Sequence, residues 1–448
     1  MNRDLTRGPV MGAMLAFAAP MILGNLLQQC YNIADTLIVG RCLGKDALAA
    51  VGSSFTLMTF LTSILLGLCL GSGALFSIRF GQKDEAGLRE SVAASFVLTA
   101  GVSVLLTLGS FLCLDFVETF MRVPGRVWPL MRAYLIVIFW GIPASFVYNY
   151  CASYLRAVGN SVVPLLFLAG AAVGNIVMDL WFVIGLGRGV RGAAEATVLA
   201  QYAAALGIAV YALKTCPPLR SLLGRGGLRV KAGSVREAAA FSVLTCVQQS
   251  VMNLGILMVQ GLVNSFGPAV MAAFAAAVKI DAFAYMPVQD FGSAFSTFAA
   301  QNYGAKQRER IQAGIRGAVL ASGAFSLAVS GIVFVFAEQL MGLFVDAAEV
   351  EVIREGVRYL RIEGVFYCGI GCLFLLYGLY RALGRPGMSV VLTVASLGTR
   401  VALAYALSAV PAVGVVGIWW SVPIGWFLAD ALGIGYYLVR RERLLGGV

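Results

Sequence analysis

The chain has no histidine, and only 12% of its 448 residues are charged. About a quarter of the residues in soluble globular proteins are charged, so a chain with this little charge and a mean hydropathy of +0.86 is not soluble and globular. The lack of histidine disfavours an intramembrane enzyme, which needs a nucleophile with a base or a metal triad. Nine cysteines include no CxxC pair, and Cys368 and Cys372 lie one helical turn apart without further ligands. We expect them to be packing residues and not metal ligands.

Long apolar runs fill most of the chain, and each meets the requirement of about 20 residues for a membrane-spanning helix. Their predicted bounds are 12–40, 46–78, 90–114, 128–150, 161–186, 191–214, 236–265, 268–300, 313–337, 357–380, 387–410 and 414–439. A β-barrel would show alternating segments of about ten residues, and these runs are longer and continuous. The first run has no cleavage site after it and predicts a retained helix. The sequence therefore predicts an all-α polytopic membrane protein with twelve transmembrane helices.

The net charge of +11 follows from topology and not from nucleic-acid binding, because the basic residues form no face on a soluble domain. With the N-terminus inside, the inner segments hold 21 of the 33 Lys and Arg residues, and the outer loops hold ten. This asymmetry is the positive-inside pattern. We expect both termini in the cytoplasm, a multi-pass location in a bacterial or archaeal inner membrane, and lipids but no nucleic acid as partners.

The two halves of the chain repeat each other. Residues 80–83 (FGQK) match 303–306 (YGAK) at an offset of 223, and 154–159 (YLRAVG) resemble 379–384 (LYRALG) at an offset of 225. Six spans per copy is an even number, so a pseudo-two-fold axis along the membrane normal should relate the copies, as in alternating-access transporters. We predict an N-terminal six-helix bundle over 1–214, a cytoplasmic linker rich in proline, glycine and basic residues over 215–235, and a C-terminal six-helix bundle over 236–448.

Asp35 lies inside the first apolar run, where an ionised carboxylate costs several kcal/mol unless something pairs with it or neutralises it. Counting about 1.5 Å per residue from the outer helix ends places Asp35, Asp179 and Thr197 at one depth, about 9 Å inside. Asn175 lies one turn deeper on the face of Asp179. These oxygen ligands suit a hard cation such as Na⁺, and a carboxylate pair can share a proton. We predict a coupling-ion site without a cofactor. Interhelical hydrogen bonding that only holds the bundle together is the alternative.

The second half does not repeat this constellation. At the matching offsets, Asp35 becomes Gly255, Asp179 becomes Ala404 and Asn175 becomes Arg400. We therefore expect one ion site, in the first half. The apolar runs of the second half carry other charged residues, namely Lys279, Asp281, Asp290, Glu363, Arg400 and Asp430. They form structural ion pairs in one interpretation and line a substrate cavity in the other.

The segment from Pro20 to Asp35 (PMILGNLLQQCYNIAD) looks like the first helix of multidrug and toxic compound extrusion (MATE) transporters. Residues 297–305 (TFAAQNYGA) resemble the family's eighth-helix ending, and residues 155–159 (LRAVG) resemble its fourth-loop motif. The resemblance covers essentially the whole chain and is to the prokaryotic DinF-like branch. It implies an antiporter in which proton or sodium influx at Asp35 drives export of amphiphilic, often cationic, organic compounds. Pro20, which predicts a kink on its own account, matches a proline at which the first helix of the family is proposed to bend.

Residues expected to contact substrate are polar and lie within or near the predicted cavity. They are Gln28, Tyr31, Asn32, Gln248, Gln249, Asn253, Lys279, Asp281 and Arg400. In another branch of the family, acids lie on helices 7 and 10. In this chain, span 7 has no acid and carries the amides Gln248, Gln249 and Asn253, and span 10 carries Glu363. A flippase for lipid-linked oligosaccharides, from the same superfamily, is the alternative function, although such proteins usually add helices or cavity arginines. We expect the chain to act as a monomer.

Overall fold

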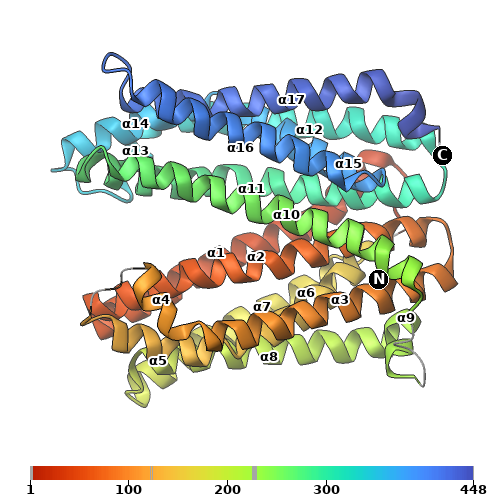
Figure 1. The fold of residues 1–448 in the computed structure, drawn as a ribbon, viewed down its shortest axis with the longest axis horizontal. Coiled ribbons are helices and arrows are strands. Elements are labelled where there is room, and N and C mark those ends of the chain that lie inside the picture. Colours follow the sequence, from red (N-terminus) through yellow and green to blue (C-terminus); the bar gives the residue numbers. More distant parts are fainter. Residues whose placement is uncertain (1–3, 122, 124, 225–229, 447–448) are drawn as a thin grey trace. The chain divides into compact units, whose positions relative to one another are not determined.

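The computed structural model describes residues 4–121, 123, 125–224 and 230–446, and in these residues it contains helices and no strand (Figure 1). The first half contains α1 (Val10–Leu43), α2 (Lys45–Gly81), α3 (Glu85–Leu112), α4 (Leu114–Met121), α5 (Trp128–Ile138), α6 (Gly141–Ala157), α7 (Val162–Asp179), the π-helix η1 (Leu180–Gly185), α8 (Gly189–Thr215), α9 (Pro217–Arg220) and the 3-10 helix η2 (Ser221–Leu223). The second half contains α10 (Ala232–Asn264), α11 (Pro268–Gly304), α12 (Arg308–Val335), α13 (Ala337–Gly342), α14 (Val350–Gly364), α15 (Tyr367–Ala382), α16 (Pro386–Ser408) and α17 (Val415–Leu445).

Within the described residues, ten candidate spans are long and apolar enough to cross a membrane, and two bent helix pairs bring the number to twelve if each pair is one span. The prediction of an all-α, twelve-span protein is confirmed. Two spans predicted as single helices, 128–150 and 357–380, are instead the bent pairs. The bend is 46° between α5 and α6 and 52° between α14 and α15. Each is the fourth span of its half, so the bend itself repeats.

The corner after the second span of each half also repeats. Lys83 follows α2 with a φ of 57°, and Lys306 follows α11 with a φ of 58°. Positive φ is uncommon for residues other than glycine, so its recurrence at the offset of 223 is a structural mark of the repeat that the sequence predicts.

The described residues divide into two compact units that differ from the predicted lobes. The first unit includes Ala19–Phe80 and Asp84–Cys246, and the second includes Leu5–Ala18, Gly81–Lys83 and Val247–Val448. The start of α1 therefore belongs to the second unit, and the start of α10, together with the described part of the predicted linker, belongs to the first. The change of unit within α1 lies beside Pro20, which is the predicted hinge.

Close backbone packing explains why the start of α10 belongs to the first unit. A Cβ atom built on Gly71 of α2 would lie 2.3 Å from the carbonyl oxygen of Phe241, and one built on Gly67 would lie 2.6 Å from the Cα of Cys246. Glycines four residues apart allow two helix backbones to approach each other in a membrane. The hydroxyl groups of Ser72 and Ser242 add a hydrogen bond of 2.9 Å at the same contact.

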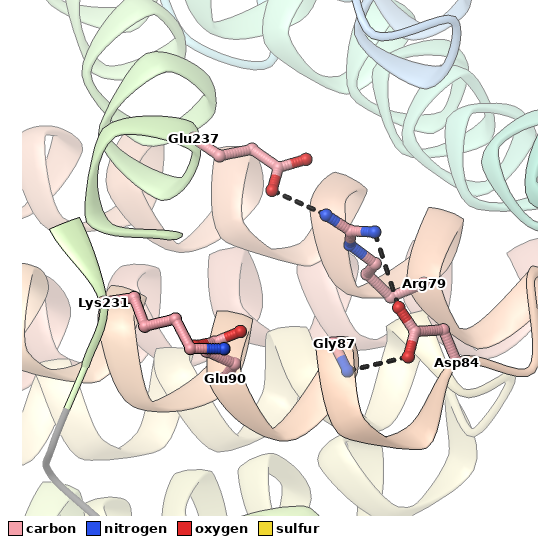
Figure 2. A network of polar contacts seen from close by, with 6 residues as sticks. All are labelled: Arg79, Asp84, Gly87, Glu90, Lys231 and Glu237. Atoms are coloured by element: carbon pink, nitrogen blue, oxygen red, sulfur yellow. Dashed lines mark hydrogen bonds and ion pairs between the residues drawn. The ribbon is translucent and has the colours of Figure 1, made fainter. Parts of the chain in front are cut away.

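A network of charged side chains also holds α10 to the first unit, as Figure 2 shows. The Arg79 guanidinium at the end of α2 lies 2.7 Å from an oxygen of Glu237 on α10 and 3.5 Å from an oxygen of Asp84. Lys231, just before α10, pairs with Glu90 of α3 at 3.1 Å. Ion pairs and close packing against glycines therefore both hold the N-terminal part of α10 in the first unit.

The segment just before α1 is held in the second unit by hydrogen bonds to its backbone. The Leu5 amide donates to the side chain of Gln301 at 3.2 Å, and the Asn302 side chain donates to the Leu5 carbonyl at 3.2 Å. The guanidinium of Arg310 donates to the carbonyl of Gly8 at 2.8 Å. Each half of the chain thus begins its first helix in the compact unit of the other half.

Candidate ion site and internal cavity

Asp35 on α1 and Asp179, the last residue of α7, lie together in the first unit. Their carboxyl groups are within hydrogen-bonding reach of each other. Asp179 is fully buried, Asp35 is half-buried, and one oxygen of each carboxyl group is buried without a hydrogen-bond partner. The two acids that the depth count placed at one level therefore meet in the structure.

Asn175 connects Asp179 to α8. It is 2% exposed, and its Nδ2 atom donates to the hydroxyl oxygen of Thr197 at 3.3 Å. In the opposite amide orientation, Nδ2 donates to Asp179 at 3.2 Å and Oδ1 accepts from the Thr197 backbone N–H at 3.3 Å. This second orientation satisfies both ends of the amide, which is the criterion for assigning it. All four predicted ion-site residues thus form one contiguous polar group.

The π-helix η1 begins directly after Asp179 and runs from Leu180 to Gly185. A π-helical turn has an extra residue per turn and is often found at functional sites within α-helices. In the second half, α16 continues as an α-helix through Ala404, the residue that matches Asp179. The sequence did not predict this difference. A π-helix follows the acid in the first half, whereas the α-helix continues past the matching alanine in the second half.

The carboxyl pair restricts what the site can hold. Two ionised carboxylates have no proton to share and repel each other, so a hydrogen bond between them requires that one carries a proton. Without that proton, a small cation between the oxygens would neutralise the pair instead, and the Asn175 and Thr197 oxygens are suitable further ligands. No group of three or more His, Cys, Asp and Glu side chains placed to bind a metal occurs among the described residues.

Two tyrosines lie near the pair, and the sequence analysis missed one of them, Tyr134. The hydroxyl of Tyr134 on α5 is within hydrogen-bonding reach of Thr197, and Asp35 and Asp179 both act on it electrostatically. Tyr31, on α1 one turn before Asp35, was predicted only as a substrate contact, and it is within reach of Gln28. The signal for Tyr134 was available, because the residue at the offset of 225 is also a tyrosine, Tyr359.

A cavity of about 120 Å³ lies beside the ion-site residues within the first unit. Its lining joins small apolar side chains to uncharged polar ones, and two predicted substrate contacts, Gln28 and Tyr31, are among them. The polar lining residues are Gln28, Tyr31, Ser145, Tyr148, Asn149, Asn175, Thr197 and Gln201. Asn32, the third contact predicted on α1, is not in this lining, and its backbone carbonyl accepts a hydrogen bond from Thr36.

The amides predicted on span 7 lie on α10 beyond the change of compact unit. Gln248 is 3% exposed and one of its side-chain atoms has no hydrogen-bond partner, whereas Gln249 and Asn253 are half-buried. Lys279 on α11 is exposed and lines a different pocket of about 820 Å³, with Asp346 and Glu349 also in its lining. Lys279 is thus not among the residues that line the first-half cavity.

Asp281, two residues from Lys279, is instead 3% exposed and faces Tyr359, Tyr367 and one other acid, Glu363. Arg400 on α16 is half-buried and lies near Asp281 and Glu363, but no ion pair joins it to either acid among the described residues. Asp430 lies elsewhere, within hydrogen-bonding reach of the thiol of Cys372.

Comparisons with known proteins agree with this architecture. The family model described as MatE matches residues 20–181 and 242–406. The chain is 29% identical over 398 residues to "Probable multidrug resistance protein YpnP" of Bacillus subtilis, covering 88% of this chain and 87% of that protein. It is 25% identical to "DNA damage-inducible protein F" of Escherichia coli, covering 93% and 89% respectively. A solved structure described as the "Outward-facing conformation of a multidrug resistance MATE family transporter of the MOP superfamily" superposes with a TM-score of 0.91 at 24% identity, covering 99% of this chain and 98% of that one. With a family model matched over both halves, this chain belongs to the MATE family.

Proposed function

We propose that this protein is a secondary efflux antiporter, in which entry of a proton or Na⁺ at Asp35 and Asp179 drives export of amphiphilic, often cationic, organic compounds. The observation that carries the proposal is the pair of carboxyl groups within hydrogen-bonding reach of each other, deep in an apolar bundle. Buried carboxyl groups are an expensive way to hold helices together, and they are typical of ion pathways in membrane proteins.

The cavity beside the pair gives the ion a means of acting on substrate. Asn175 and Thr197 belong both to the ion-site group and to the cavity lining, so a change in the charge of the pair alters the walls that a substrate contacts. When the pair is without its cation, its negative charge attracts a cationic substrate. When the cation returns, the attraction is lost, and the substrate is released.

Alternating access would use the two helices that change compact unit. In this proposal, α1 bends beside Pro20, and the lobes are the first and second six-helix bundles joined through residues 215–235. The protein acts as a monomer in an inner membrane with both termini in the cytoplasm, surrounded by lipid and without nucleic acid. The comparisons, which give multidrug resistance proteins, do not favour the flippase alternative.

Transport by the purified protein in liposomes tests this function. Vesicles with only a proton gradient are compared with vesicles that have only a Na⁺ gradient, against a panel of organic cations. Efflux driven by one gradient and abolished by its collapse is expected, and the active gradient names the coupling ion. Substrate movement that neither gradient accelerates would overturn the antiport mechanism.

A further inference from the structure

Three arginines form a stripe along the exposed face of α14. Arg354, Arg358 and Arg361 are spaced by four and three residues, so they lie one above the other on one side of the helix. All three are exposed, and we call them the arginine stripe. The residues that α14 buries lie on the other side of the helix, and they are Val352, Gly356, Tyr359, Leu360, Glu363 and Gly364. The outer face of this helix is therefore charged, unlike that of an ordinary membrane span.

The arginine stripe lies at the end of the second-unit helices that is opposite the C-terminus, where α12 ends and α14 begins (Figure 1). The positive-inside pattern gathers basic residues on the side of the two chain ends, so it does not account for three arginines on this side. The repeat does not account for them either. At the offset of 225, the stripe positions become Pro129, Ala133 and Ile136 of α5. The arginines are thus particular to the second half, and the shared fold does not require them.

Apolar side chains beside the stripe are open to the lipid. They lie at the end of α12 and just after it, each is between 46% and 64% exposed, and they are Ile332, Phe334, Val335 and Phe336. A Cβ atom built on Gly364 of α14 would lie 3.0 Å from Cγ1 of Val333, so the two helices pack closely here. One turn earlier on α14, the guanidinium carbon of Arg361 lies 5.5 Å from the centre of the Phe334 ring. Arg361 therefore places its charge at a lipid-facing apolar surface.

The matching aromatic residue of the first half has different neighbours. At the offset of 223, Phe334 matches Phe111 at the end of α3. The Phe111 ring lies 5.6 Å from the ring of Phe139 and 5.3 Å from that of Trp140. Aromatic rings thus surround this position in the first unit, whereas a cation lies over it in the second.

Carboxylates of the chain neutralise little of the stripe. Arg358 lies 3.8 Å from Glu355, and the Arg358 side chain is 53% exposed, so this pair is weak. No ion pair of Arg354 or Arg361 occurs among the described residues. Since arginine keeps its proton in proteins, the stripe carries a permanent positive charge and has hydrogen-bond donors left for an anion.

We infer that the arginine stripe binds the phosphate group of an anionic phospholipid, whose acyl chains lie against the exposed apolar side chains at the end of α12. The guanidinium group matches phosphate with two parallel hydrogen bonds, and a long arginine side chain reaches from within a span to the level of the lipid headgroups. Free phosphate would use the arginines alone, whereas a phospholipid also covers the apolar surface beside Phe334. The positive charge of a choline headgroup opposes the stripe, so a lipid with an uncharged glycerol headgroup is favoured.

Native mass spectrometry of the purified full chain tests the inference, with phosphatidylglycerol and phosphatidylcholine that have the same acyl chains. The wild type should retain phosphatidylglycerol in preference to phosphatidylcholine. Each basic residue near an anionic lipid surface contributes about a factor of five, so Arg358→Gln/Arg361→Gln should bind the tightest phosphatidylglycerol about 25-fold more weakly. The matched control is Arg126→Gln/Arg132→Gln, which removes two exposed arginines on the same side of the membrane.

The control should keep the wild-type affinity, because Arg126 and Arg132 already lie 3.4 Å from Asp46 and 3.7 Å from Asp115. Equal loss in both double variants would overturn the inference, as would equal retention of the two lipids by the wild type. Inorganic phosphate should not displace the lipid, and displacement by it would show a site for free phosphate instead. Thermal unfolding in detergent reports folding. If the double variant does not fold, Arg361→Gln alone should weaken binding about fivefold, and an unchanged affinity would refute the proposal.

Discussion

Replacing Asp35 by asparagine is the sharpest test of the ion site, because the substitution removes the ionisable group and keeps the shape of the side chain. An asparagine amide can still donate to Asp179, so the contact between α1 and α7 should survive. A monovalent cation about 4 Å from a carboxylate gains about 4 kcal/mol at an effective dielectric constant near 20. Each 1.4 kcal/mol is a factor of about ten, so the variant should bind the coupling cation about a thousandfold more weakly.

The assay is gradient-driven efflux of an organic cation from liposomes, with thermal unfolding in detergent as the measure of folding. Asp430→Asn is the matched control, because Asp430 is also a buried acid, 5% exposed, and lies in the other unit beside Cys372. We expect the Asp35 variant to lose driven efflux with its unfolding temperature nearly unchanged, and the Asp430 variant to retain driven efflux. Full driven efflux by Asp35→Asn would refute the assignment of the coupling role.

Three predictions concern the packing of the first unit. Gly71→Ala should destabilise the protein by about 3 kcal/mol through overpacking against the α10 backbone, whereas Gly101→Ala, with nothing within 4 Å, should be neutral in the same thermal unfolding assay. Exchanging the charges of Arg79 and Glu237 singly should cost about 1 kcal/mol each, because both side chains are about a third exposed, and the double exchange should recover only part of the loss, because the acid then at position 79 faces Asp84. Burial raises the pKa of the Cys216 thiol, which reduces its thiolate fraction near neutral pH, so maleimide labelling should be slow and should accelerate only at higher pH. Rapid neutral labelling of folded protein would contradict that last prediction.

The fold could be predicted because the features that determine it are long and lie within continuous segments of the chain. Apolar runs of spanning length and the distribution of basic residues define the helices, and the offsets of 223 and 225 define the repeat. The bends in the fourth span of each half were missed, since hydropathy averages over a window and is insensitive to the direction of a helix. The membership of the first residues of α10 was also missed. It depends on Gly67 and Gly71 meeting a backbone that lies far away in the sequence, and apolar composition does not encode such a contact.

The candidate ion site could be predicted in part, because the depth of a residue in the membrane follows from counting residues along its helix. Counting residues from the helix ends placed Asp35 and Asp179 at one level, and the structure brings their carboxyl groups together. Depth alone does not give direction around a helix. Lys279 and Asp281, for example, have opposite exposures despite being two residues apart, and the expected substrate contact of Asn32, which is not in the lining of the first-unit cavity, stays a prediction. The π-helix after Asp179 has no signal in the composition of the segment.

Both units contain a pair of buried carboxyl groups, whose negative charge is unfavourable inside a membrane, and the residues around the two pairs differ. A pair of carboxyl groups at membrane depth must be neutralised, and the neutralising charge either comes from solution or belongs to the protein. In the first unit, the residue beside the pair is Asn175, which contributes no charge, so in our proposal the neutralising cation enters and leaves. In the second unit, the residue that matches Asn175 is Arg400, and the buried acids Asp281 and Glu363 lie on other elements, α11 and α14. Because Asp35 and Asp179 also become Gly255 and Ala404, the two halves differ at several matched positions, and in our proposal these differences leave the first half as the site of ion exchange.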